Sequence, residues 1–175
     1  QDFPNIYRQK IKTKYERMIS KAKSEIIIET PYFLPGHNLR KYLCEAVQRG
    51  VNTIVVMPIH SDVKFVDIIR RHYLGILHQA GVKIYFYTQS NLHSKGLMID
   101  NQIFSISSAN FDYRSFRYQY ELALIGEETS MIPQLRQHFD STLKHCTSFN
   151  YQEWKNRSIF KRLSEVILLP FRYLF

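Results

Sequence analysis

Three short, almost wholly apolar runs limit what this chain can fold into. They are "EIIIET" (25–30), "VNTIVVMP" (51–58) and "VKIYFY" (82–87). Strands this apolar are buried on both faces, as in parallel sheets that are covered by helices. Segments with helical periodicity precede them, near residues 5–22, 38–49 and 62–79, and Gly50 and Gly81 stand where the second and third should end. The pattern predicts an α/β layer fold.

The pattern changes after residue 87. Three closely spaced β-type runs follow, at 95–100, 102–107 and 118–125, and Asp100-Asn101 between the first two is typical of a hairpin turn. A helix is expected near residues 128–145, and a basic, apolar segment begins at Trp154. Antiparallel strands should therefore extend the parallel ones, which predicts a mixed β-sheet flanked by helices on both faces.

The net charge of the chain limits the classes of molecule that it is expected to bind. There are 24 Lys and Arg against 15 Asp and Glu, a net charge of +9, which favours nucleic acid, phospholipid headgroups or phosphorylated small molecules. Cys44 and Cys146 lie outside any spacing typical of a disulfide framework or a zinc site. The chain begins with Gln1 and a charged, helix-like segment, so we expect a piece of a longer protein without a signal peptide or membrane span at this end.

Polar side chains recur within the otherwise apolar stretch "LHSKGLMIDNQIFSISSAN", residues 92–110. On a strand, His93 and Lys95 would face the same side and could approach one phosphate together. A hairpin at 100–101 would bring Ser108 and Asn110 back beside them as hydrogen-bond donors. A nucleophile, a cation and neutral donors can stabilise the extra negative charge of a phosphodiester under attack.

Glu121 stands in the apolar run "YELALI", where an unpaired carboxylate would be costly to bury. We expect its partner to be the second ring nitrogen of His93, which would fix the imidazole tautomer. Turn geometry alone explains Asp100. The other histidines, among them His60, His72 and His138, are isolated in the sequence and are assigned no role.

The pattern His-x-Lys-x4-Asp followed by Ser-Ser-x-Asn resembles the HKD motif of the phospholipase D superfamily, and the resemblance continues through "SANFDYRSF" (108–116). It implies that one motif's histidine forms a phosphohistidine while a second motif's histidine protonates the leaving group, with no metal or other cofactor. The implied catalytic residues are His93, Lys95, Asp100 and Glu121, and the implied phosphate-binding residues are Lys95, Ser108 and Asn110. Ser107 departs from the glycine usual in the family.

Upstream segments resemble the second half of bacterial cardiolipin synthases: "TPYFLP" (30–35), "RGVNTIVVMP" (49–58) and "AGVKIYFY" (80–87). The resemblance implies a phospholipase D-like half-domain over residues 1–150 that transfers a phosphatidyl group between phosphatidylglycerol-like phospholipids. The second HKD half would be joined covalently or come from an identical subunit. Two alternatives remain: a homodimeric phosphodiesterase or nuclease acting on nucleic acid, and a degenerate HKD module that only binds anionic lipid or nucleic acid.

Residues 151–175 form a basic amphipathic segment. Its apolar residues follow helical spacing, and the longest apolar run is well below the roughly 20 residues that span a bilayer. The apolar positions are Ile159, Phe160, Leu163, Val166 and Ile167, and the cations around them are Lys155, Arg157, Lys161 and Arg162. We expect peripheral attachment to an anionic, bacterial cell membrane. The alternative is a helix docked on the core of its own domain.

Overall fold

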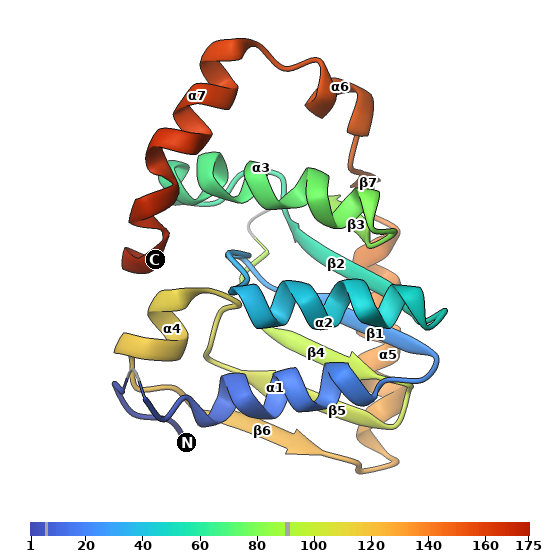
Figure 1. The fold of residues 1–175 in the computed structure, drawn as a ribbon. Helices are drawn as coiled ribbons and strands as arrows, with labels where there is room; N and C mark the ends of the chain where they lie inside the picture. The colour runs from blue at the N-terminus through green and yellow to red at the C-terminus, as the bar shows by residue number, and fades with distance from the viewer. Residues whose placement is uncertain (6, 90–91) are drawn as a thin grey trace.

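In the computed structural model, which describes residues 1–5, 7–89 and 92–175, a seven-stranded sheet has the order β6-β5-β4-β1-β2-β3-β7 (Figure 1). The strands are β1 (Glu25–Glu29), β2 (Asn52–Pro58), β3 (Lys83–Tyr87), β4 (Gly96–Ile99), β5 (Ile103–Ser107), β6 (Ala123–Gly126) and β7 (Cys146–Ser148). The longer helices are α1 (Lys10–Lys21), α2 (His37–Gln48), α3 (Lys64–Gln79), α5 (Met131–Leu143) and α7 (Ile159–Leu168).

The sheet is mixed, as the sequence predicts. Strands β1, β2 and β3 are parallel, while β4 is antiparallel to β1 and leads through β5 to β6 in an antiparallel series. The change of direction occurs beside β1, where Glu29 pairs with Gly96. Strand β1 therefore has the motif-bearing strand on one side and the parallel strands on the other.

Helices cover both faces of the sheet, which confirms the predicted layers. Figure 1 shows α1, α2 and α3 on one side and α5 on the other. Successive side chains of β1 alternate between the hydrophobic cores on the two faces of the sheet. Ile26 and Ile28 pack on the α1 and α2 side, whereas Ile27 packs with Phe139 of α5. Glu29 is two residues beyond Ile27 and so faces α5.

The two glycines predicted to end helices, and the Asp100-Asn101 pair predicted to turn the chain, have the expected backbone conformations. Gly50 and Gly81 follow α2 and α3 with φ values of +87° and +97°, a backbone region that glycine enters without strain. Asp100 and Asn101 turn the chain between β4 and β5 with φ values of 56° and 52°. Positive φ at both central residues is typical of a type I′ turn, which the Gln102 amide closes by donating to the Ile99 carbonyl at 3.0 Å.

One local expectation was wrong, and two short elements were not predicted. The run expected as a strand over 118–125 is extended only from Ala123, and Glu121 precedes β6 in an isolated bridge with Asp2. A short helix, α4 (Tyr113–Tyr118), intervenes because the Asp112 carboxylate accepts a hydrogen bond from the Ser115 amide and caps it. The edge strand β7 was not predicted, since three residues carry too little pattern.

The C-terminal segment folds back over α3 through α6 (Tyr151–Lys155), α7 and a 3-10 helix (Leu169–Leu174). The indole Nε1 of Trp154 donates to the Arg71 carbonyl at 2.7 Å. Helix α7 turns Glu165 inward, where it forms a two-point ion pair with Arg157. Its apolar stripe faces solvent: Phe160 is 80% exposed. No helix in the described residues has the length and apolar character needed to cross a membrane.

The contact between α3 and Trp154 can be tested through Gly75. A Cβ at this position would lie 2.2 Å from Trp154 Cζ2, so Gly75→Ala should displace the indole and lower the free energy of unfolding by about 1–3 kcal/mol. Without that contact the same change in a helix would stabilise by about 1 kcal/mol. The measurement is denaturant unfolding, with Gly36→Ala as the control because its Cβ would have ordinary contacts. A stabilised Gly75→Ala protein would contradict the packing.

Candidate active site

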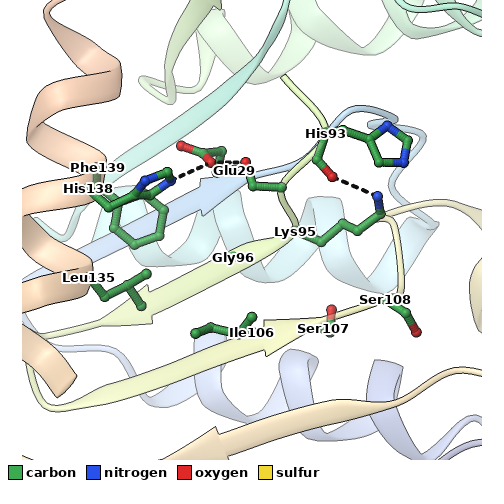
Figure 2. A pocket seen from close by; sticks show the side chains of 11 residues that line it. Glu29, His93, Lys95, Gly96, Ile106, Ser107, Ser108, Leu135, His138 and Phe139 are labelled. Atoms are coloured by element: carbon green, nitrogen blue, oxygen red, sulfur yellow. Dashed lines mark hydrogen bonds and ion pairs between the residues drawn. The ribbon is translucent and has the colours of Figure 1, made fainter. Parts of the chain in front are cut away.

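A cavity of about 600 Å³ lies on the α5 side of the sheet, at the end where β4 begins (Figure 2). Its size falls within the usual range for small-molecule sites. It is lined by Glu29, His93, Ser94, Lys95, Gly96, Ile106, Ser107, Ser108, Leu135, His138 and Phe139. Three of the lining residues come from the predicted motif stretch just before β4, and three from α5.

Strand register builds the floor of the cavity. Glu29 pairs with Gly96, and Gly96 pairs with Ile106 on β5, so these residues form a row that faces α5. A Cβ on Gly96 would lie 3.0 Å from Phe139 Cζ. The missing side chain at residue 96 therefore lets the α5 ring approach the floor.

His93 and Lys95 lie at the same end of the cavity (Figure 2), although residues 92–95 precede β4 instead of belonging to it. The Lys95 ammonium donates to the His93 carbonyl at 2.8 Å. Burial lowers the pKa of Lys95, and the nearby charges of Glu121, Asp112 and Asp62 partly oppose this shift. The His93 side chain is exposed, and within the described part of the chain its ring has no hydrogen-bond partner.

The expected contact between Glu121 and His93 is not formed. The Ser108 hydroxyl donates to the Glu121 carboxylate instead and accepts the Leu122 amide at 3.0 Å. Glu121 is 7% exposed, so this hydroxyl partly satisfies a buried acid. Ser108 lines the cavity as predicted.

Asn110 is not among the cavity-lining residues. Its backbone amide donates to the Ser115 hydroxyl at 3.1 Å, and its Oδ1 is buried without a hydrogen-bond partner in the described residues. Its neighbour Asp112 is buried, and desolvation raises the pKa of that carboxyl to about 6 despite the Ser115 hydrogen bonds. Asn110 thus lies beside a second buried acid.

Asp100 lies at the opposite end of β4 from the rest of the motif. Its carboxylate accepts hydrogen bonds from the backbone amides of Lys23, Ser24 and Glu25, at 2.7 to 3.1 Å. Partial burial alone would raise its pKa, but these amides outweigh that effect and lower it. The catalytic assignment of Asp100 is therefore corrected to a structural one, as its turn position indicates.

Sequence reasoning missed three polar cavity residues, Glu29, Ser94 and His138. The imidazole Nε2 of His138 lies 2.8 Å from Glu29 Oε1, and the Ser94 hydroxyl donates to the same oxygen (Figure 2). Glu29 ends an apolar strand and His138 lies 109 residues later, so only the packing of α5 on the sheet unites them. An acid at the end of a buried strand was the one available signal.

Residues 15–143 match the family described as "Cardiolipin synthase, PLD-like domain". The chain belongs to this family. It is 34% identical to a cardiolipin synthase of Clostridium perfringens over 94% of its own length and 35% of that protein's. For the major cardiolipin synthase of Bacillus subtilis the identity is 32%, over 94% and 34% of the two lengths. The chain thus spans about a third of the length of these relatives.

Solved structures support the fold. Nuc from Salmonella typhimurium, a phospholipase D family member, superposes with a TM-score of 0.67 at 17% identity, covering 79% of this chain and 90% of Nuc. Phosphatidylserine synthase from Haemophilus influenzae gives 0.71 at 11% identity, covering 94% of this chain and 42% of the synthase. No group of three or more His, Cys, Asp or Glu residues suited to a metal ion occurs in the described ranges.

The Asp100 assignment predicts a pH-dependent loss of stability. Asp100→Asn tolerates the positive φ but loses the charge, so it should lower the free energy of unfolding by about 1–2 kcal/mol, allowing for the exposure of the site. Because the folded-state pKa lies below the unfolded value near 3.9, the difference from wild type should be complete above about pH 5. It should disappear as the pH falls through the folded-state pKa. Unfolding curves from pH 7 to pH 2.5 measure this, and equal stability at pH 7 would refute it.

Proposed function

We propose that this chain is one half of the active site of a cardiolipin-synthase-type phosphatidyltransferase. The observation that carries the proposal is the cavity on the α5 side of the sheet, which gathers His93, Lys95 and Ser108. Identity of 32–34% to cardiolipin synthases over 94% of the chain supports the same reaction class. The substrate would be a phosphatidylglycerol-like phospholipid.

The proposed chemistry follows from what each side chain can do. The Lys95 ammonium attracts the phosphodiester and offsets the negative charge that grows as a fifth oxygen or nitrogen approaches phosphorus. The exposed His93 ring can attack phosphorus, forming an N–P bond as the alcohol leaves, or donate a proton to the leaving oxygen. The predicted neutral donors would act only after a local rearrangement, because the Ser108 hydroxyl donates to Glu121 and Asn110 lies outside the cavity lining.

A single His93 cannot complete this reaction. In-line displacement needs a nucleophile and a proton donor on opposite sides of phosphorus, and one imidazole occupies one side. The second HKD half must then come from another part of a longer chain or from a second copy. Exposed apolar side chains favour a covering partner there: Ile106 lines the cavity, and Leu124 pairs with it on β6.

One observation favours a homodimeric phosphodiesterase as the second candidate. The superposition covers 90% of Nuc but 42% of the phosphatidylserine synthase, so this fold occurs both alone and as part of a longer chain. With a net charge of +9, a dimer of this chain could bind nucleic acid through its phosphates. The greater sequence identity to cardiolipin synthases places this candidate second.

The C-terminal segment would hold the enzyme on an anionic membrane. The apolar stripe of α7 is exposed, with Ile159 and Phe160 at 72% and 80%. Lys155 and Lys161 have no ion pair within the described residues and could face headgroups, whereas Arg157 is engaged by Glu165. An exposed apolar stripe with nearby cations is typical of interfacial helices.

In an active form that contains both halves, either a dimer or the longer chain, we expect His93→Ala to lower phosphodiester turnover more than a hundredfold. The melting temperature should stay unchanged, because the ring is exposed and fills no core. Lys95→Ala should lose a similar amount, and Glu121→Gln less, since it acts through Ser108. Release of glycerol from phosphatidylglycerol vesicles measures turnover, with nucleic acid as the competing substrate.

The control for this series is His78→Ala, at the opposite end of α3 from the cavity, which should keep wild-type turnover. The molecular mass in solution is measured on the same preparations to distinguish a monomer from a dimer. Turnover above about a hundredth of wild type in His93→Ala, or full activity in a strict monomer, would reject the half-site proposal. An active dimer that hydrolyses nucleic acid would favour the second candidate.

The membrane role of α7 predicts that Phe160→Ser/Leu163→Ser weakens binding to anionic vesicles at least about tenfold, since each side chain contributes on the order of 1.5–3 kcal/mol when buried in apolar surroundings. Binding by the wild type should fall with added salt. Vesicle co-sedimentation measures both effects. Tyr7→Ser is the control, because Tyr7 is 90% exposed and lies near the other terminus. Equal binding by the double variant and the wild type would remove the proposal.

A further inference from the structure

Glu29 is a buried carboxylate that the protein alone does not fully satisfy. Its side chain is wholly buried, and Oε1 accepts the Ser94 hydroxyl and lies 2.8 Å from His138 Nε2. Its Oε2 is buried with no hydrogen-bond partner in the described residues. A buried acid with an unsatisfied oxygen is costly, and an apolar residue at this strand position would avoid the cost. The acid therefore has a use beyond filling the core.

Glu29 contacts His138, and His138 lies between the buried acid and the cavity. Its side chain is 47% exposed and lines the cavity, in contrast to the buried acid behind it (Figure 2). Because Nε2 is turned toward Glu29, the second ring nitrogen is left without a partner in the described part of the chain. Glu29 thus fixes the orientation of an imidazole whose other nitrogen remains available to a ligand.

The two ends of the cavity differ in charge. Lys95 and His93 form one end, where a cation favours a phosphodiester. At the other end, the Glu29 carboxylate stands directly behind His138 and would repel a second phosphate. Near it lie the Ser94 hydroxyl, which donates to Glu29, and the apolar side chains of Leu135 and Phe139. Neutral hydrogen-bonding groups beside apolar surface suit an uncharged group that carries hydroxyls on a short carbon chain.

We propose that His138, positioned by Glu29, forms a subsite for the hydroxyl-bearing alcohol portion of the substrate, such as a glycerol group. A hydroxyl both donates and accepts, so it can bind the free imidazole nitrogen in either protonation state. The subsite rests on the proposed function, because the Lys95 end must hold the phosphodiester. It would let this half-site favour a polyol phosphodiester over one without hydroxyls.

The test compares two monoanionic phosphodiesters: glycerophosphoglycerol, which carries hydroxyls, and diethyl phosphate, which has none. Dissociation constants for the full chain are measured by NMR titration. We expect the wild type to bind glycerophosphoglycerol about tenfold more tightly, as one or two net hydrogen bonds provide. His138→Phe should reduce this ratio to near one and leave the constant for diethyl phosphate unchanged. His78→Phe is the control. His78 belongs to α3, on the opposite face of the sheet from α5, so this variant should keep the ratio.

A second variant controls for the possibility that His138→Phe loses the preference through misfolding. Glu29→Leu/His138→Phe replaces the whole pair with apolar side chains, so no buried charge is left unpaired, and it should also lose the preference. A tenfold preference that survives in the folded double variant would overturn the subsite. A wild type that binds both probes equally, in a Lys95-dependent manner, would overturn the subsite alone. Binding of neither probe would overturn the proposed function as well.

Discussion

The antiparallel pairing of β1 with β4 is the constraint on which the site depends. It places Glu29 opposite Gly96, and so sets the end of a buried strand beside the segment that carries His93 and Lys95. Glycine at 96 leaves room above the sheet, and α5 closes that room on one side. A shift of the register by one residue would turn Glu29 into the opposite core and remove the floor of the cavity.

Much of the fold follows from local patterns in the sequence. The apolar runs, the glycines after α2 and α3, and the Asp100-Asn101 turn each encode a feature that needs few neighbours to form. Elements whose shape depends on a single local hydrogen bond or on an edge position were missed. Helix α4 exists through the Asp112 cap, and β7 through three residues of pairing with β3. Neither produces a periodic signal.

The site was only partly predictable for a related reason. His93, Lys95 and Ser108 lie within one hairpin, so short spacing reveals their convergence on the cavity. The partner of Glu121 depends on side-chain geometry between segments, and the sequence suggested His93 where Ser108 stands. His138 reaches the cavity only because α5 crosses the sheet. Convergence of this kind depends on tertiary packing, which the spacing of residues in one helix does not encode.

The two edges of the sheet differ in how much unpaired backbone they offer. Strand β7 is three residues long and leads directly into α6, so it offers little free backbone. Strand β6 presents an open edge, with Leu122 and Leu124 exposed nearby at 65% and 56%. An apolar, uncovered edge recruits strands from other molecules. Of the two edges, β6 is therefore the one that offers more accessible backbone for pairing with a strand of another molecule.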